Sequence, residues 1–338
     1  AVELRLGTSG HAGGAFETLS SIVALVPDDR AQRERLAKLA VDLGALERRA
    51  EVLRGVADGP VSHATRGSLL LEAGVTYEEG LANTSAAAEL YRGVLSLSDA
   101  ERADSLAAAR ALSGILRVSG APEELASVLE RLAELAPAAP ERRLALGEAA
   151  EVALSKLNDP TRAISNLEAR LKLGGDDVEA IDALCKALER ARRFEELVVA
   201  LERRAELSED EDSARSDRTR AAQLLSRALE DRPRAIAAFR RVRGLHGRSS
   251  ELFESLKELL TEEQDFKALA ELYDDEVAHE ADTERQRSLY LELGAVHRHH
   301  TGELLRALEA FVVARDWERA IEVAGLHPAD AALGLKVV

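Results

Sequence analysis

The stretch FEELVVALERRAEL, from Phe194 to Leu207, decides the fold because its pattern returns at a fixed interval on both sides. The chain reads PEELASVLERLAEL (Pro122 to Leu135) 72 residues upstream and FKALAELYDDEVAH (Phe266 to His279) 72 residues downstream. In each copy apolar residues recur three or four positions apart, which is the spacing of one face of a helix. A fixed period of this kind indicates a repeat array and not a set of separate globular domains.

The composition favours helices and limits the classes of partner. Of 338 residues, 46% are apolar, 31% are charged and only 3% are aromatic, a mixture that suits helices better than sheets. The formal charge of −16 repels phosphate backbones, so we expect no nucleic-acid partner. A single cysteine excludes an intrachain disulfide framework, and no apolar run approaches the ~20 residues that span a bilayer. We interpret the excess of arginine over lysine as a coding bias.

The 72-residue period contains two helical hairpins. Ala163 and Ala235 are aligned positions, and Leu197 lies 34 residues after the first and 38 before the second. The unit is therefore one 34-residue hairpin plus one hairpin with a four-residue extension.

A 34-residue helix-turn-helix unit with this apolar pattern resembles the tetratricopeptide repeat (TPR). The resemblance extends from about residue 16 to 315 and implies an all-α solenoid, a right-handed superhelix of roughly eight or nine tandem hairpins. Arg170 and Arg204 depart from it, because they stand where the family favours small residues, and Gly175 replaces the usual terminal proline. The residues that carry the resemblance are Leu184, Cys185, Leu188, Leu197 and Leu201 in one hairpin, and Asn158-Asp159-Pro160, Ala163, Ile164 and Leu167 in the other.

The repeat divides the chain into four expected parts. We predict a flexible N-terminal segment at 1–14, TPR-like hairpins at 15–61, an array with the 72-residue double repeat at 62–315, and a C-terminal cap or truncated further repeat at 316–338. The last part stays open because RDWERAI, from Arg315 to Ile321, also reads as a turn and second helix. We expect SEDEDSARSD, from Ser208 to Asp217, to be a charged loop or a frayed helix start.

Two segments could carry ligand chemistry. The glycine-rich opening, Gly7 to Gly14, lacks both the Lys-Ser/Thr pair and the preceding strand of a phosphate loop, so we expect a flexible end there. His297 and His300 lie three apart, with His299 between them and Glu303 nearby, which makes a zinc or nickel site a candidate. The repeat argues against that site, because it places His297 at a packing position and His299 at the surface. We therefore expect no metal and no other cofactor.

Three further features could be functional, but a structural role is the simpler interpretation of each. Cys185 is expected to be a packing thiol because its position takes a small residue in the resembling family. Trp317 could anchor a partner, but its place beside a turn favours packing. The recurring arginines could form a ladder for acidic ligands, although pairing within their own helices and solvent exposure are simpler; they are Arg162, Arg234 and Arg306. No catalytic triad, zinc-protease helix or paired-carboxylate motif occurs, so we predict that the chain is not an enzyme.

The resemblance implies a protein–protein interaction scaffold that binds a peptide or a partner protein on a surface lined by first helices. In the best-fitting unit the residues off the packing stripe are Asp182, Lys186, Glu189 and Arg190, whose mixed charges show no tuning for acidic tails. The alternative is a regulatory module of a larger enzyme or secretion complex, with the catalytic part outside this chain. Self-association stays open.

The source and location are also inferred from the chain. We expect a bacterial protein. The sequence begins at Ala1 and contains no Met, which is typical of a processed or excised form. We favour a cytoplasmic location, and because the start is of this kind we leave a periplasmic one open.

One substitution tests this register. Leu197→Asp is expected to unfold the neighbouring hairpins, because an unpaired charge in a packed interface costs several kcal/mol, on the order of 3 or more. Cys185→Ser should leave stability nearly unchanged. Thermal melting of the two variants checks the alignment, and equal melting temperatures would show that the register is wrong.

Overall fold

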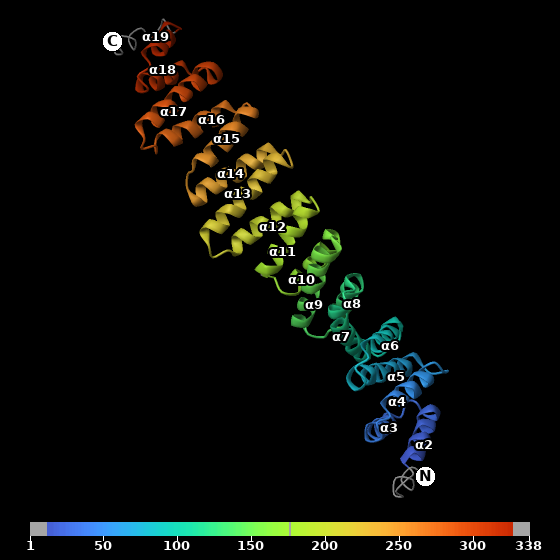
Figure 1. Ribbon diagram of the computed structural model, residues 1–338. Helices are drawn as coiled ribbons and strands as arrows, with labels where there is room; N and C mark the ends of the chain where they lie inside the picture. Colours follow the sequence, from blue (N-terminus) through green and yellow to red (C-terminus); the bar gives the residue numbers. More distant parts are fainter. Residues whose placement is uncertain (1–11, 176, 327–338) are drawn as a thin grey trace. The chain divides into compact units, whose positions relative to one another are not determined.

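The computed structural model describes residues 12–175 and 177–326, and within these ranges the chain forms helices and turns but no strand (Figure 1). The predicted all-α solenoid of tandem helical hairpins is confirmed. The α-helices are α2 (Ala12–Leu25), α3 (Arg30–Asp42), α4 (Leu46–Ala57), α5 (His63–Val75), α6 (Thr84–Ser96), α7 (Arg102–Ser119), α8 (Pro122–Leu135), α9 (Ala139–Val152), α10 (Pro160–Leu173), α11 (Val178–Arg190), α12 (Phe194–Leu207), α13 (Glu211–Arg227), α14 (Arg232–His246), α15 (Ser250–Glu262), α16 (Phe266–Val277), α17 (Thr283–Val296), α18 (Leu304–Val313) and α19 (Trp317–Leu326).

The chain divides into two compact units, Ala1–Ala191 and Arg192–Val338. In the first unit each helix packs on the next one along the chain, from α2 through α11. The second unit repeats this arrangement from α12 through α19. The sequence-based boundaries at residues 61 and 315 stay a prediction, and residues 1–11 and 327–338 of the expected end segments lie outside the described residues.

Each hairpin turn contains one residue in the left-handed conformation. Glycine meets this need without strain, but most of these turns use other residues, at a cost of about 1–2 kcal/mol each. The backbone repeats the sequence period, since two interleaved series are each spaced by 72 residues. The first is Gly120, Arg192 and Gln264, and the second is Asn158, Glu230 and Gly302, with φ between 52° and 74°.

The residue after the left-handed position in each hairpin turn is the N-cap of the next helix. Asp159, Asp231 and Asp265 each accept a hydrogen bond from the backbone N–H three residues further on. Such a cap contributes typically about 1 kcal/mol, because it satisfies a donor that the first turn of a helix leaves unpaired. Capping therefore offsets much of the strain of the preceding turn.

The predicted four-residue extension lies at the end of alternate first helices. There α9 continues into a π-helical turn, η2 (Ala153–Leu157), and α17 continues into η3 (His297–Thr301). A third such turn, η1 (Thr76–Gly80), follows α5. The first helices of the shorter hairpins, α11 and α15, have 13 residues and no such turn.

Apolar stripes from consecutive helices form the core. The predicted packing residues are buried, including Leu197, which is 1% exposed, and the thiol-bearing Cys185. Two glycines bring paired helices close together: a Cβ on Gly74 would lie 2.6 Å from the ring of Tyr91, and the corresponding atom at Gly294 would lie 2.7 Å from Phe311. Each glycine therefore makes room for a large ring on the second helix of its hairpin.

The acidic segment that we expected to be a loop or a frayed start is mostly helix. Helix α13 begins at Glu211, with Asp210 accepting a hydrogen bond from the Ser213 N–H. Further along, Asp217 is buried and receives two hydrogen bonds from Arg204, at 2.8 and 2.6 Å. This bidentate pair to the preceding helix is the physical reason why the helix starts before the apolar pattern does.

The C-terminal turn does form as a repeat turn, but Trp317 does not pack as predicted. Arg315 is left-handed, and Asp316 caps α19 by accepting from the Arg319 N–H. The contact with α18 is made by Ala320 and Val323, both buried. Because the buried stripe begins after the first residue of α19, the Trp317 side chain stays 48% exposed.

Candidate binding groove

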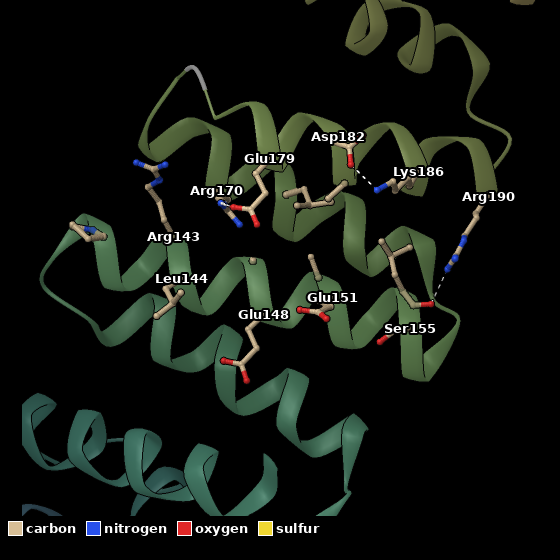
Figure 2. A pocket seen from close by; sticks show the side chains of 16 residues that line it. Arg143, Leu144, Glu148, Glu151, Ser155, Arg170, Glu179, Asp182, Lys186 and Arg190 are labelled. Carbon is tan, nitrogen blue, oxygen red and sulfur yellow. Dashed lines mark hydrogen bonds and ion pairs between the residues drawn. The ribbon is translucent and has the colours of Figure 1, made fainter. Parts of the chain in front are cut away.

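A groove with a volume of about 860 Å³ lies between the two first helices α9 and α11 (Figure 2). Gly147 and Ala150 of α9 and Ala183 of α11 line it with small side chains, and Leu167 of α10 contributes an apolar one. Charged side chains from α9 and α11 surround this apolar part. The groove is therefore open, with a narrow apolar surface between two charged margins.

One buried carboxylate holds the three helices of the groove together. Asp177 is 8% exposed and caps α11 by accepting from the Ala180 N–H at 3.1 Å. Its Oδ2 also accepts from Arg143 of α9 at 2.9 Å and from Arg170 of α10 at 2.8 Å. Burial alone would raise the pKa of Asp177, but the hydrogen bonds from Arg143, the Ala180 N–H and Arg170 keep it below its usual value.

Two glycines make room for these arginines. A side chain at Gly147 would overlap the guanidinium group of Arg170, and one at Gly174 would lie 2.8 Å from that of Arg143. Arg170 stands where the resembling family favours a small residue, and Gly147 on the neighbouring helix α9 provides the space for it. The sequence contained the signal, an arginine where a small residue is expected and a glycine inside a helix, but not which residues meet.

Three of the four residues predicted to line a binding surface do line this groove. Asp182 and Lys186 form an ion pair at 2.6 Å, and Arg190 donates to the Leu154 carbonyl at 2.9 Å. Glu189 is exposed on α11 but does not line the groove. The prediction missed the residues that α9 contributes, because periodicity does not show which helices face one another.

The recurring arginines pair mainly between helices, contrary to our expectation. Arg162 binds Glu123 of α8 at 2.7 Å, and Arg234 binds Glu195 of α12 at 3.1 Å. These two pairs lie 72 residues apart, so the ion pair follows the repeat. Arg306 pairs instead with the N-cap residue of its own helix. The guanidinium groups are thus already bound to carboxylates and form no ladder for acidic ligands.

One histidine of the cluster is part of the packing. His297 is 2% exposed, and its Nδ1 lies 3.1 Å from both Glu303 Oε2 and Thr301 Oγ1. His299 and His300 are exposed, and His300 stacks on the Phe266 ring at 3.7 Å between centroids. Residues 12–175 and 177–326 contain no group of three or more His, Cys, Asp or Glu side chains that could hold a metal ion.

Comparisons with known proteins return helical repeats. No family model matches the chain, and no curated protein matches it. A structural match is the C-terminal part of a TPR repeat-containing protein from Cytophaga hutchinsonii, with 12% identity, 72% of this chain and 94% of that chain covered, and a TM-score of 0.33. Another is a tetratricopeptide repeat protein from Parabacteroides merdae, with 14% identity, coverage of 74% and 93%, and a TM-score of 0.30.

The TPR-like character of the chain rests on the hairpins and turns described above. At TM-scores of 0.33 or less, the structural matches carry no argument about function. Across the described part of the chain, no helix has the length and apolar character needed to cross a membrane.

The Asp177 network predicts a pH-dependent stability. Asp177→Asn should destabilise the protein by about 3 kcal/mol at pH 7, because it leaves two arginines without their shared carboxylate. The folded-state pKa is depressed, so this stabilisation is present above the unfolded pKa of about 4 and is lost as the pH falls through the folded-state value.

Urea unfolding at pH 7 and pH 3 measures this effect. The difference between wild type and Asp177→Asn should shrink at pH 3, whereas Asp42→Asn, at the exposed end of α3, should change stability little at either pH. An equal loss at both pH values for Asp177→Asn would show that its charge does not stabilise the fold.

Proposed function

We propose that the chain is a protein-interaction scaffold and that the groove between α9 and α11 binds a peptide segment of a partner protein. The observation that carries this proposal is the groove itself. Its volume of about 860 Å³ lies within the range of roughly 300–1,000 Å³ typical of ligand sites. Its small apolar lining leaves room for partner side chains, and the polar margins offer groups that fix orientation.

The groove has the length to hold a peptide. Its lining residues on α9 and η2 run from Pro140 to Ser155, which at 1.5 Å per residue corresponds to roughly 22 Å. An extended segment of six or seven residues has about that length at ~3.3 Å per residue. A single extended segment of a partner therefore matches the site.

The lining chemistry favours binding over catalysis. Ser155 provides the one hydroxyl among the described residues that line the groove, and no histidine or cysteine lies beside it there. Nucleophilic catalysis needs an adjacent base within hydrogen-bonding reach of the nucleophile. Most of the charged side chains are instead held in ion pairs or hydrogen bonds. We therefore propose a non-enzymatic role.

Blocking the groove tests the proposal. A random 12-residue peptide library displayed on phage is selected on the full chain, and enriched peptides are synthesised with a fluorophore. Ala183→Trp places a large side chain in the groove and should weaken their binding at least tenfold, as measured by fluorescence anisotropy. Ala31→Trp, the same change at an exposed position of α3, should leave binding unchanged.

Two outcomes would contradict the proposal. The library could yield no enriched peptide, or the enriched peptides could bind Ala183→Trp as tightly as wild type. Circular dichroism of both tryptophan variants shows whether the helices are intact.

A further inference from the structure

We propose that the partner segment presents a basic side chain, Lys or Arg, to Glu151 in the middle of the groove, with an apolar side chain beside Leu144. This inference rests on the proposed function, because it names the chemistry of the partner at that same groove. It is carried by the charges that the groove leaves uncompensated and by the position of its one strongly exposed leucine.

Every cation that lines the groove already has an acceptor. Arg143 is bound to Asp177, and Arg170 is bound to the same carboxylate and to Glu179. The two remaining cations are also engaged, one in the Lys186 ion pair and one in the hydrogen bond from Arg190. Three of these four cations are already paired with carboxylates, so a partner carboxylate would have to share them with the present acceptors. The groove is therefore a poor site for an acidic tail.

The carboxylates that line the groove are also bound to cations, with one exception. Glu148 receives two hydrogen bonds from Arg117 of α7, at 2.6 and 2.7 Å. Glu179 and Asp182 are held by cations of the groove. Among the described residues, Glu151 is exposed and has no ion pair or side-chain hydrogen bond, although it lines the groove. Figure 2 shows it between α9 and α11.

Leu144 adds an apolar contact on the same helix face. It is 73% exposed and lines the groove, two helical turns before Glu151. Residues seven apart on a helix share a face and are separated by about 10 Å along the axis. Three residues of an extended segment cover about the same distance. An apolar and a basic side chain about three positions apart in the partner would therefore reach both residues.

The net charge of the chain favours the same partner. At −16, its field attracts basic segments and raises their rate of encounter, while it repels acidic ones. The local charge of Glu151 and the net charge of the chain therefore both favour a basic partner segment.

Library selection tests the inference with the charge on Glu151 as the variable. The same 12-residue phage library is selected separately on wild type, on Glu151→Gln and on Glu151→Lys, and the enriched pools are sequenced. The wild-type pool should be enriched in Lys or Arg near an apolar residue. That enrichment should disappear on Glu151→Gln and change to Asp or Glu on Glu151→Lys.

Combining a peptide substitution with a protein substitution measures how much the ion pair with Glu151 contributes to affinity. In a peptide from the wild-type pool, replacing the basic residue by Gln should weaken binding roughly two- to fivefold, which is the range for an exposed ion pair. The same replacement in the peptide should not change its affinity for the Glu151→Gln variant. Glu51→Gln, at an exposed position of α4, should behave as wild type.

The outcomes separate this inference from the proposed function. If peptides are enriched and Ala183→Trp blocks them, but the basic preference is absent or survives Glu151→Gln, the groove binds peptides and this inference is wrong. An acidic preference on wild type would also overturn it. If no peptide is enriched, both proposals fail together.

Discussion

The groove depends on a single shared carboxylate. Asp177 begins α11, and the arginines that bind it come from α9 and α10, so one buried group ties the two sides of the groove to its base. Without Asp177, Arg143 would lose its carboxylate partner and the partly buried Arg170 would keep only Glu179, which makes the network position-specific. A side chain at Gly147 would overlap the guanidinium group of Arg170 in its present position, so the glycine leaves room for that group beside Asp177. Site and fold are therefore built by the same contacts.

Arginine has a second structural use in this chain. Pairs such as Arg162 with Glu123 and Arg234 with Glu195 join a second helix to the second helix of the preceding hairpin. In a repeat array each hairpin contacts mainly its neighbours, so stability is approximately a sum of local terms. Interhelical ion pairs that follow the 72-residue period are among those terms. The abundance of arginine, which we attributed to coding bias, thus has structural consequences.

The fold could be predicted because packing repeats with the sequence. Residues such as Leu197 recur at fixed positions wherever two helices meet, and the left-handed turns recur with the same period. The groove could be predicted only in part. Helical spacing places Asp182 and Lys186 off the packing stripe, but the partner of Arg170 depends on which helices face one another. Trp317 was misjudged for the same reason, because its exposure depends on where α19 meets α18.

We propose that partners bind between α9 and α11, and photo-crosslinking can show this contact. A peptide selected on the full chain is made with one benzoylphenylalanine residue, irradiated in complex with the protein and mapped by mass spectrometry. The groove predicts crosslinks within residues 139–157 and 178–190. Crosslinks confined to residues 192–326, or to the second helix α8, would contradict it.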